Sequence, residues 1–89
     1  MSEAYLEVTY RHGRAMAAYY YLPRRGEDKS EQTRRVEPGL VIDFACDGRA
    51  IGIEILAPAQ ITLPTFNRVL AELGFPPLQQ ADLAPLLAA

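Results

Sequence analysis

The feature that most restricts how this chain can fold is an Asp-Gly pair between two apolar segments. The segments are LVIDFA (40–45) and AIGIEIL (50–56), and the pair is Asp47-Gly48. Asp-Gly between apolar segments is one of the strongest short signals for a β-hairpin, because glycine accepts the positive φ that a tight turn requires. The sequence therefore predicts two antiparallel strands joined at Asp47-Gly48.

The register of this hairpin sorts its side chains between two surfaces. If Cys46 faces Arg49, one surface is wholly apolar and consists of Leu40, Ile42, Phe44, Ile51, Ile53 and Ile55. Side chains alternate along a strand, so the opposite surface carries Val41, Asp43, Gly52 and Glu54. We expect the apolar surface to be covered by a helix and Glu54 to point away from it. Gly52 leaves room there for another group to approach closely.

Three further strands are predicted before this hairpin. AYLEVTYR (4–11) and AMAAYYYL (15–22) are rich in strand-forming residues and flank a turn at His12-Gly13. In the simplest register Leu6 faces Tyr19 and Tyr5 faces Tyr20. QTRRVE (32–37) predicts a short strand that ends at a Pro38-Gly39 turn, and the polar segment 23–31 predicts a mobile loop.

The segment ITLPTFNRVLAELG (61–74) predicts a helix over residues 62–73. Thr62 is a suitable N-cap, and Pro64 falls in the first turn, where proline is tolerated. An apolar stripe at helical spacing consists of Leu63, Phe66, Val69, Leu70 and Leu73. Gly74 and Pro76-Pro77 end the helix. A second short helix capped by Asp82 is predicted within the C-terminal tail 75–89.

Together these elements predict an α+β fold. We expect one small domain over residues 1–89, with an antiparallel β-meander of four to five strands over 4–56 and the helix packed on one face. A chain of this length has a thin core, and its only cysteine, Cys46, excludes an internal disulfide. A second subunit is the remaining stabiliser, so we expect a homodimer formed through the other sheet face or a sheet edge.

Composition argues against several functional classes. The net charge is −2, although residues 1–35 carry +2 and residues 36–89 carry −4. This balance does not favour nucleic acid or membrane as a partner. One cysteine and one histidine provide no zinc site, and no glycine-rich phosphate loop is present, so no catalytic residue, metal or cofactor is predicted. The lack of an export signal and the free cysteine favour the cytoplasm.

Asp43 and Glu54 are predicted to lie diagonally on one surface of neighbouring strands. Two close carboxylates could act as a general acid and base, or bind a hard cation such as Mg²⁺. The simpler interpretation, which we favour, is that they form ion pairs with Arg34 or Arg35. These four residues form the predicted polar interface cluster.

The triplet Tyr19-Tyr20-Tyr21 is the second candidate surface. With Arg11, Arg14, Arg24 and Arg25 nearby, these rings could stack single-stranded bases. Tyrosines on both faces of a half-buried strand are the simpler interpretation. We therefore predict an interaction surface here and keep a nucleic-acid-binding module, using the Tyr/Arg hairpin, as the alternative function.

The segment EQTRRVEPGLVIDFACDGRAIGIEILAPA (31–59) resembles the prokaryotic family Domain of Unknown Function 2283. The resemblance rests on an apolar strand with Asp43, the Asp47-Gly48 turn and the closing Gly-Ile-Glu-Ile-Leu of residues 52–56. The N-terminal hairpin is similar as well, but basic RHGR (11–14) replaces the family's acidic turn. The resemblance implies a small α+β fold and no established activity, and some relatives look like antitoxin-like halves of two-protein modules. We therefore predict a non-enzymatic, dimeric protein-interaction module.

Overall fold

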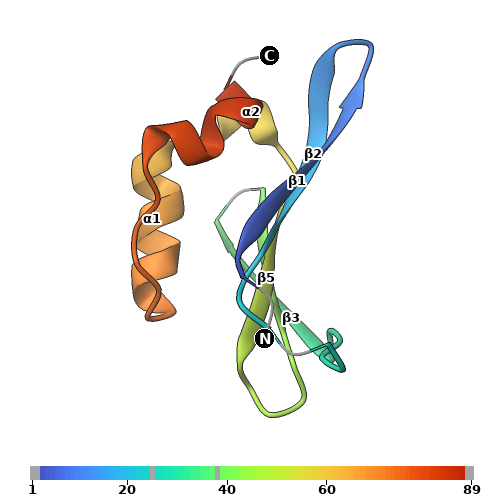
Figure 1. The fold of residues 1–89 in the computed structure, drawn as a ribbon, viewed down its shortest axis with the longest axis vertical. Coiled ribbons are helices and arrows are strands. Elements are labelled where there is room, and N and C mark those ends of the chain that lie inside the picture. The colour runs from blue at the N-terminus through green and yellow to red at the C-terminus, as the bar shows by residue number, and fades with distance from the viewer. Residues whose placement is uncertain (1–2, 25, 38, 88–89) are drawn as a thin grey trace.

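The computed structural model describes residues 3–24, 26–37 and 39–87. Figure 1 shows its two layers, a five-stranded antiparallel sheet and a layer of helices on one side of it. This confirms the predicted α+β class. The strands are β1 (Tyr5–Arg11), β2 (Arg14–Tyr21), β3 (Gln32–Glu37), β4 (Leu40–Phe44) and β5 (Ala50–Ile55). The helices are η1 (Pro58–Gln60), α1 (Leu63–Glu72), η2 (Gln80–Leu83) and α2 (Ala84–Leu87).

The strand order is β1-β2-β5-β4-β3, so the last strand in the chain occupies the centre of the sheet. Strands β3, β4 and β5 follow one another as a meander, and β1 and β2 form a separate hairpin. The hairpin joins the meander through β2 and β5, where Tyr20 lies opposite Ile53. Residues 22–31 carry the chain from the middle of the sheet to its far edge. The predicted meander therefore consists of two antiparallel units side by side.

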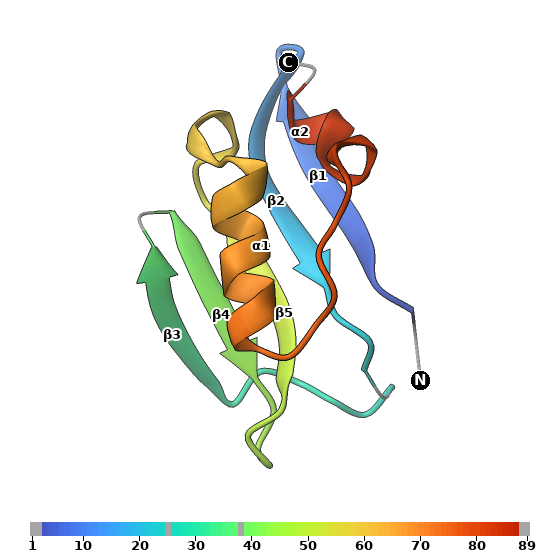
Figure 2. The same ribbon diagram turned by 90° about the vertical axis from the view of Figure 1, so that its left-hand side faces the viewer.

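Helix α1 lies across β2, β5 and β4, as Figure 2 shows. Its N-cap is Thr62, whose hydroxyl accepts a hydrogen bond from the Thr65 N–H at 3.3 Å, and its apolar stripe faces the sheet, with Phe66 fully buried. Gly74, with a φ of 84°, follows the helix as predicted. The fully buried side chains beneath α1 include Leu40, Ile42, Ile53 and Ile55. Each contributes roughly 1.5–3 kcal/mol before its conformational entropy is subtracted.

The predicted register of β4 and β5 is confirmed from Leu40 to Asp43 but changes near the turn. A bulge makes Phe44 face Ala50 and leaves Ile51 as an extra residue. Ile51 is fully buried but does not belong to the apolar cluster under α1. The prediction that it faces the helix is wrong, because one inserted residue breaks the alternation of side chains.

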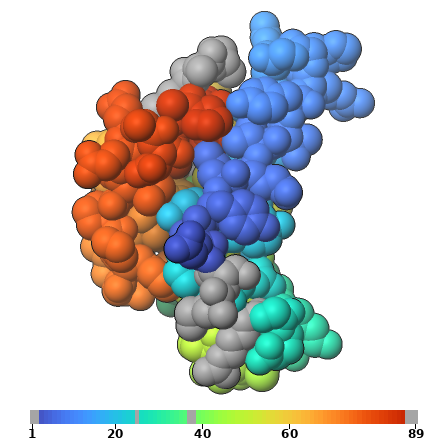
Figure 3. Space-filling view, viewed as in Figure 1, coloured from blue at the N-terminus to red at the C-terminus, as the bar shows by residue number. Residues whose placement is uncertain are grey.

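A second bulge alters the register of β1 and β2. Arg11 faces Arg14 as predicted, but Met16 is an extra residue, so Leu6 faces Tyr20 and Tyr5 faces Tyr21. The predicted Leu6–Tyr19 and Tyr5–Tyr20 pairs are therefore wrong. Because β2 pairs with β5 only over residues 18–21, the outer part of the hairpin projects beyond the sheet, as Figure 3 shows in blue.

The C-terminal segment returns along the same side of the sheet as α1. The predicted second helix is present as η2 followed by α2. Its N-cap is Gln79 and not Asp82 as predicted, but Asp82 still takes part in capping, because its carboxylate accepts a hydrogen bond from the Gln79 N–H at 2.8 Å. Residues 88–89 of that prediction, and Pro38 of the predicted Pro38-Gly39 turn, lie outside the described residues. The Tyr10 hydroxyl donates a hydrogen bond to the Pro85 carbonyl at 2.7 Å, which ties the projecting hairpin to α2.

Candidate functional site

The face of the sheet that points away from α1 is the candidate functional surface, and we call it the open face. The described helices all lie on the other side of the sheet (Figure 1). Strand register and alternation place on the open face Tyr5, Glu7, Thr9, Arg11, Tyr19, Tyr21, Thr33, Arg35, Val41, Asp43, Gly52 and Glu54. The open face therefore combines aromatic rings with charged groups of both signs.

Three tyrosines of β1 and β2 pack together on the open face. The rings of Tyr5 and Tyr21 stack with their centroids 4.4 Å apart, and Tyr19 meets Tyr21 edge to face at 4.6 Å. Tyr20 is not part of this surface: it is 9% exposed and packs edge-on against Phe66 of α1. The predicted triplet therefore contributes two rings, because alternation turns the middle one into the core. Tyr5 was missed, since only the bulge at Met16 brings it opposite Tyr21.

A hydrogen bond joins Tyr19 of β2 to Asp43 of β4, two strands away. The Tyr19 hydroxyl donates to Asp43 Oδ2 at 2.6 Å. The tyrosine side chain reaches Asp43 by lying over Gly52 of β5, where a Cβ atom would overlap the ring and the hydroxyl. This confirms the expected close approach at Gly52. Burial first, and the bond to Asp43 second, raise the pKa of the Tyr19 phenol well above its usual value.

The four residues of the predicted polar interface cluster do not all meet. Asp43 and Glu54 lie diagonally on the open face as expected, since Asp43 faces Gly52 and Val41 faces Glu54. Arg35 faces Val41 and so shares that face. Arg34 faces Ile42, lies on the helix side and places its guanidinium over the Phe44 ring at 5.4 Å. None of the ion pairs between described residues joins Glu54 to either arginine.

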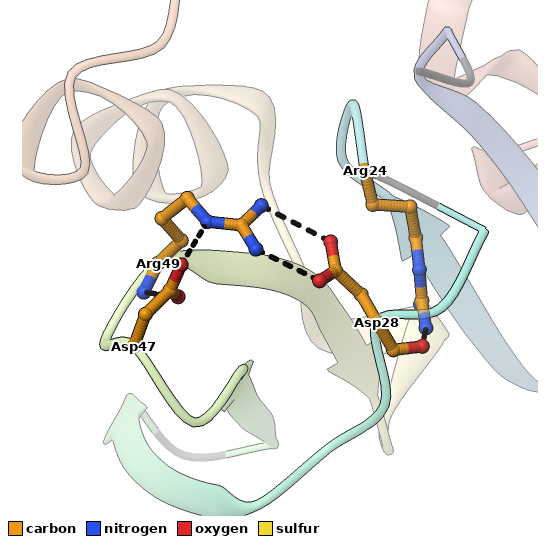
Figure 4. A network of polar contacts seen from close by, with 4 residues as sticks. All are labelled: Arg24, Asp28, Asp47 and Arg49. Carbon is orange, nitrogen blue, oxygen red and sulfur yellow. Dashed lines mark hydrogen bonds and ion pairs between the residues drawn. The ribbon is translucent and has the colours of Figure 1, made fainter.

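Two ion pairs between described residues share Arg49, as Figure 4 shows. Its guanidinium donates two hydrogen bonds to the Asp28 carboxylate, at 2.8 and 3.0 Å, and one to Asp47 at 2.7 Å. Arg24 donates to the Asp28 backbone carbonyl at 2.8 Å. The hydrogen bonds to Asp28 and Asp47 raise the pKa of Arg49, and Arg49 lowers the pKa of Asp47. The loop predicted to be mobile is therefore fastened at Asp28 to the β4–β5 turn.

This network was not anticipated, because Asp28 and Arg49 lie far apart in the chain. A hollow of about 270 Å³ lies on the open face beside the fastened loop. Tyr19, Tyr21, Arg24, Ser30 and Ile51 line this hollow.

The other residues that could bind a metal or act in catalysis lie apart from one another. Within residues 3–24, 26–37 and 39–87, no three histidine, cysteine or acidic side chains come together as a metal site would require. His12 sits in the hairpin turn with a φ of 52°, and the Cys46 thiol is exposed. None of the helices described is long and apolar enough to span a membrane.

Comparison with known proteins identifies one family. Residues 17–57 match the model of a family described as "Protein of unknown function (DUF2283)". Neither a curated protein nor a solved structure matches the sequence. The match confirms the resemblance predicted from the sequence and includes Tyr19, Asp43, Gly52 and Glu54. It does not include β1 or the helices.

Proposed function

We propose that this chain, whose residues 17–57 belong to the DUF2283 family, is a non-enzymatic protein-interaction module that acts as a dimer in the cytoplasm. Its open face binds a basic segment of a partner protein. The observation that carries this proposal is the cluster of Tyr5, Tyr19 and Tyr21 on a sheet face that no described helix covers.

The chemistry of the open face favours a basic partner. Tyr5 is 51% exposed, and the face of a tyrosine ring attracts arginine and lysine side chains. Glu7, Asp43 and Glu54 share this face with Arg11, Arg35 and Arg24, whose guanidinium is 5.8 Å from the centre of the Tyr21 ring. The basic segment is therefore expected to contact the Tyr5 ring and the carboxylates of Asp43 and Glu54. Aromatic groups at the centre of a contact with charges around them are typical of protein interfaces.

A binding role rather than a catalytic one is supported by the state of the carboxylates. Asp43 already accepts the Tyr19 hydrogen bond, which reduces its availability as a general base. Glu54 lies on the next strand beside Val41, and the described residues bring no histidine or third acid to the pair. The exposed Cys46 thiol accords with a reducing compartment.

The nucleic-acid alternative receives less support. Tyr21 pairs with Tyr5 at one end of the β1–β2 hairpin, whereas Arg11 pairs with Arg14 at the other. Six residues of strand separate the two ends by roughly 20 Å. Phosphate neutralisation by Arg11 and Arg14 would therefore fall away from the stacked rings, and of the hairpin's neighbouring arginines Arg24 lies over the Tyr21 ring at 5.8 Å.

Fluorescence anisotropy with defined probes tests the proposal. The probes are a labelled arginine-serine peptide, a glutamate-serine peptide of equal length and a single-stranded oligothymidylate. We expect the basic peptide alone to bind, and Tyr5→Ala and Glu54→Gln each to weaken it several-fold. Met16→Ala is the matched control, because Met16 is as exposed as Tyr5 but lies at the hairpin tip. Preference for the oligothymidylate would establish the alternative, and binding of neither probe would refute both.

An antitoxin-like role is the most specific form of this proposal. The partner would then be a small basic protein encoded beside this chain. Co-expression of the two is expected to yield a stable complex that a Tyr5→Ala/Glu54→Gln double variant weakens. A complex of unchanged affinity with that variant would exclude the open face as the contact.

A further inference from the structure

The outer edge of β1 is an unpaired strand edge. In the sheet order β1 and β3 are the two end strands, and within the described chain no strand pairs with their outer sides. Strand β3 is poorly suited to further pairing, because it is bulged between Arg35 and Glu37 and carries adjacent arginines. Strand β1 has seven residues, no proline or lysine, and its bulge lies on the partner strand β2. Of the two edge strands, β1 is therefore the one less protected against pairing with a strand of another molecule.

At the tip of the β1–β2 hairpin two positive charges face each other without an acidic partner in any ion pair between described residues. Arg11 of β1 lies directly opposite Arg14 of β2, and like charges in this position destabilise a hairpin. The ion pairs between described residues do not include either arginine. Glu7, the acid of the same strand, is four residues or roughly 13 Å away along β1, and its carboxylate accepts a 3.5 Å hydrogen bond from the Tyr21 hydroxyl.

We propose that two copies of the chain pair through their β1 strands, antiparallel and centred on Thr9, so that both sheets become one. This arrangement rests on the dimer of the proposed function and specifies its interface. In this register Glu7 of each copy faces Arg11 of the other, which supplies the missing counter-charge twice. Thr9 faces its own counterpart, and threonine pairs are favourable across antiparallel strands.

The helix side of β1 suits the same register. Val8 is half-buried against the core, and Tyr10 is 51% exposed with its hydroxyl bound to Pro85. Centring the pair on Thr9 places Val8 of each copy opposite Tyr10 of the other, so apolar surface is covered on this side. Main-chain hydrogen bonds along the joined strands supply affinity. The two open faces then lie on the same side of one sheet and form a continuous binding surface.

Charge exchange tests the interface. Sedimentation equilibrium of the wild-type chain is expected to show a dimer at micromolar concentration. Glu7→Arg and Arg11→Glu should each weaken association at least tenfold, because each places like charges opposite one another twice. The double variant Glu7→Arg/Arg11→Glu should restore association to within about threefold of wild type by reversing both pairs. Circular dichroism verifies that each variant is folded.

Cross-linking tests the register. In a Cys46→Ser background, Thr9→Cys places two thiols opposite each other across the twofold axis, at a Cα separation that a disulfide can span. We expect rapid oxidation to a covalent dimer, whereas the matched Thr33→Cys control on the β3 edge stays monomeric on denaturing gels. Thr33 is also an exposed residue of an edge strand.

The outcomes separate this inference from the proposed function. If the wild-type chain is a monomer at 100 µM, both the β1 interface and the proposed dimer are refuted. Peptide binding on the open face is tested separately by the anisotropy experiment. A dimer that ignores both charge exchanges, or that cross-links at Thr33 and not at Thr9, refutes the β1 interface alone.

Discussion

The Tyr19 hydroxyl donates a 2.6 Å hydrogen bond to the Asp43 carboxylate across the backbone of Gly52. The two residues belong to β2 and β4, which do not pair with each other, and Gly52 belongs to β5 between them. One side chain thus ties the β1–β2 hairpin to the meander in addition to the main-chain bonds between β2 and β5. The absence of a side chain at position 52 is what makes this crossing possible.

Gly52→Ala is expected to destabilise the protein by about 1–3 kcal/mol, because the added methyl group displaces the Tyr19 ring and breaks its bond to Asp43. Urea denaturation gives the free energy of unfolding. In a Tyr19→Ala background the same glycine substitution should cost much less, because the obstructing ring is absent. If the loss of unfolding free energy is equal in the two backgrounds, the Tyr19 ring is not the reason that position 52 requires glycine.

Tyr19→Phe should lower stability by about 0.5–1.5 kcal/mol at neutral pH, because the half-buried Tyr19–Asp43 bond is lost. It should also change the response to alkali. The pKa of Tyr19 is raised in the fold, so the folded state holds the phenol proton more tightly than the unfolded state does. The associated stability is complete below about pH 10, the unfolded phenol pKa, and is lost as pH rises toward the folded value.

Urea midpoints measured at about pH 8, 10 and 11 check the alkaline effect. The wild type should lose stability more steeply above pH 10 than Tyr19→Phe. Some loss will remain in the variant, because burial also raises the pKa values of Tyr20 and Tyr21. Parallel curves for the two proteins would contradict the assignment.

Ile53→Ala should cost about 2–5 kcal/mol, because Ile53 is fully buried in the centre of β5 beneath α1. Leu56→Ala is the matched control three residues away. Leu56 is 41% exposed, so its truncation should cost about 0.5 kcal/mol or less. Chemical denaturation of both variants measures the difference, and similar costs would mean that the β5 faces are wrongly assigned.

Arg49→Lys should release the loop between β2 and β3. Lysine keeps the charge but lacks the planar fork that donates two hydrogen bonds to Asp28. Amide hydrogen exchange of residues 26–31 should accelerate, while exchange in β4 and β5 stays unchanged. Asp47→Asn is the control, since it leaves the Arg49–Asp28 pair intact. If hydrogen exchange accelerates equally in both variants, the loop is held by the Asp47-Gly48 turn and not by the Arg49–Asp28 pair.

The sequence predicted correctly those parts of the fold that depend on one local signal. The Asp47-Gly48 turn and the alternation around it predicted the pairs from Leu40 to Asp43, and Thr62 with the apolar stripe predicted α1. The same pattern placed Asp43 and Glu54 diagonally on one face. These features depend on neighbours within a few residues, which a sequence displays directly.

The errors have a common physical origin. The two bulges behind the wrong pairs insert one residue each, Met16 and Ile51, and that residue reverses alternation without leaving a local signature. The pairing of β2 with β5 decides which tyrosines reach the open face, and the crossover of residues 22–31 brings Asp28 to Arg49. Both depend on contacts between distant segments, so the candidate surface was predicted less completely than the strands.

The central position of β5 has a consequence for protein synthesis. A ribosome makes β1, β2, β3 and β4 before it makes the strand that joins them, so the emerging polypeptide holds two separate pieces with exposed edges until residue 55 leaves the exit tunnel. A chain truncated before residue 50 lacks β5, so we expect its β1–β2 and β3–β4 pairs not to join into one sheet. The five-stranded sheet can close only when its central strand, the last to be made, has arrived.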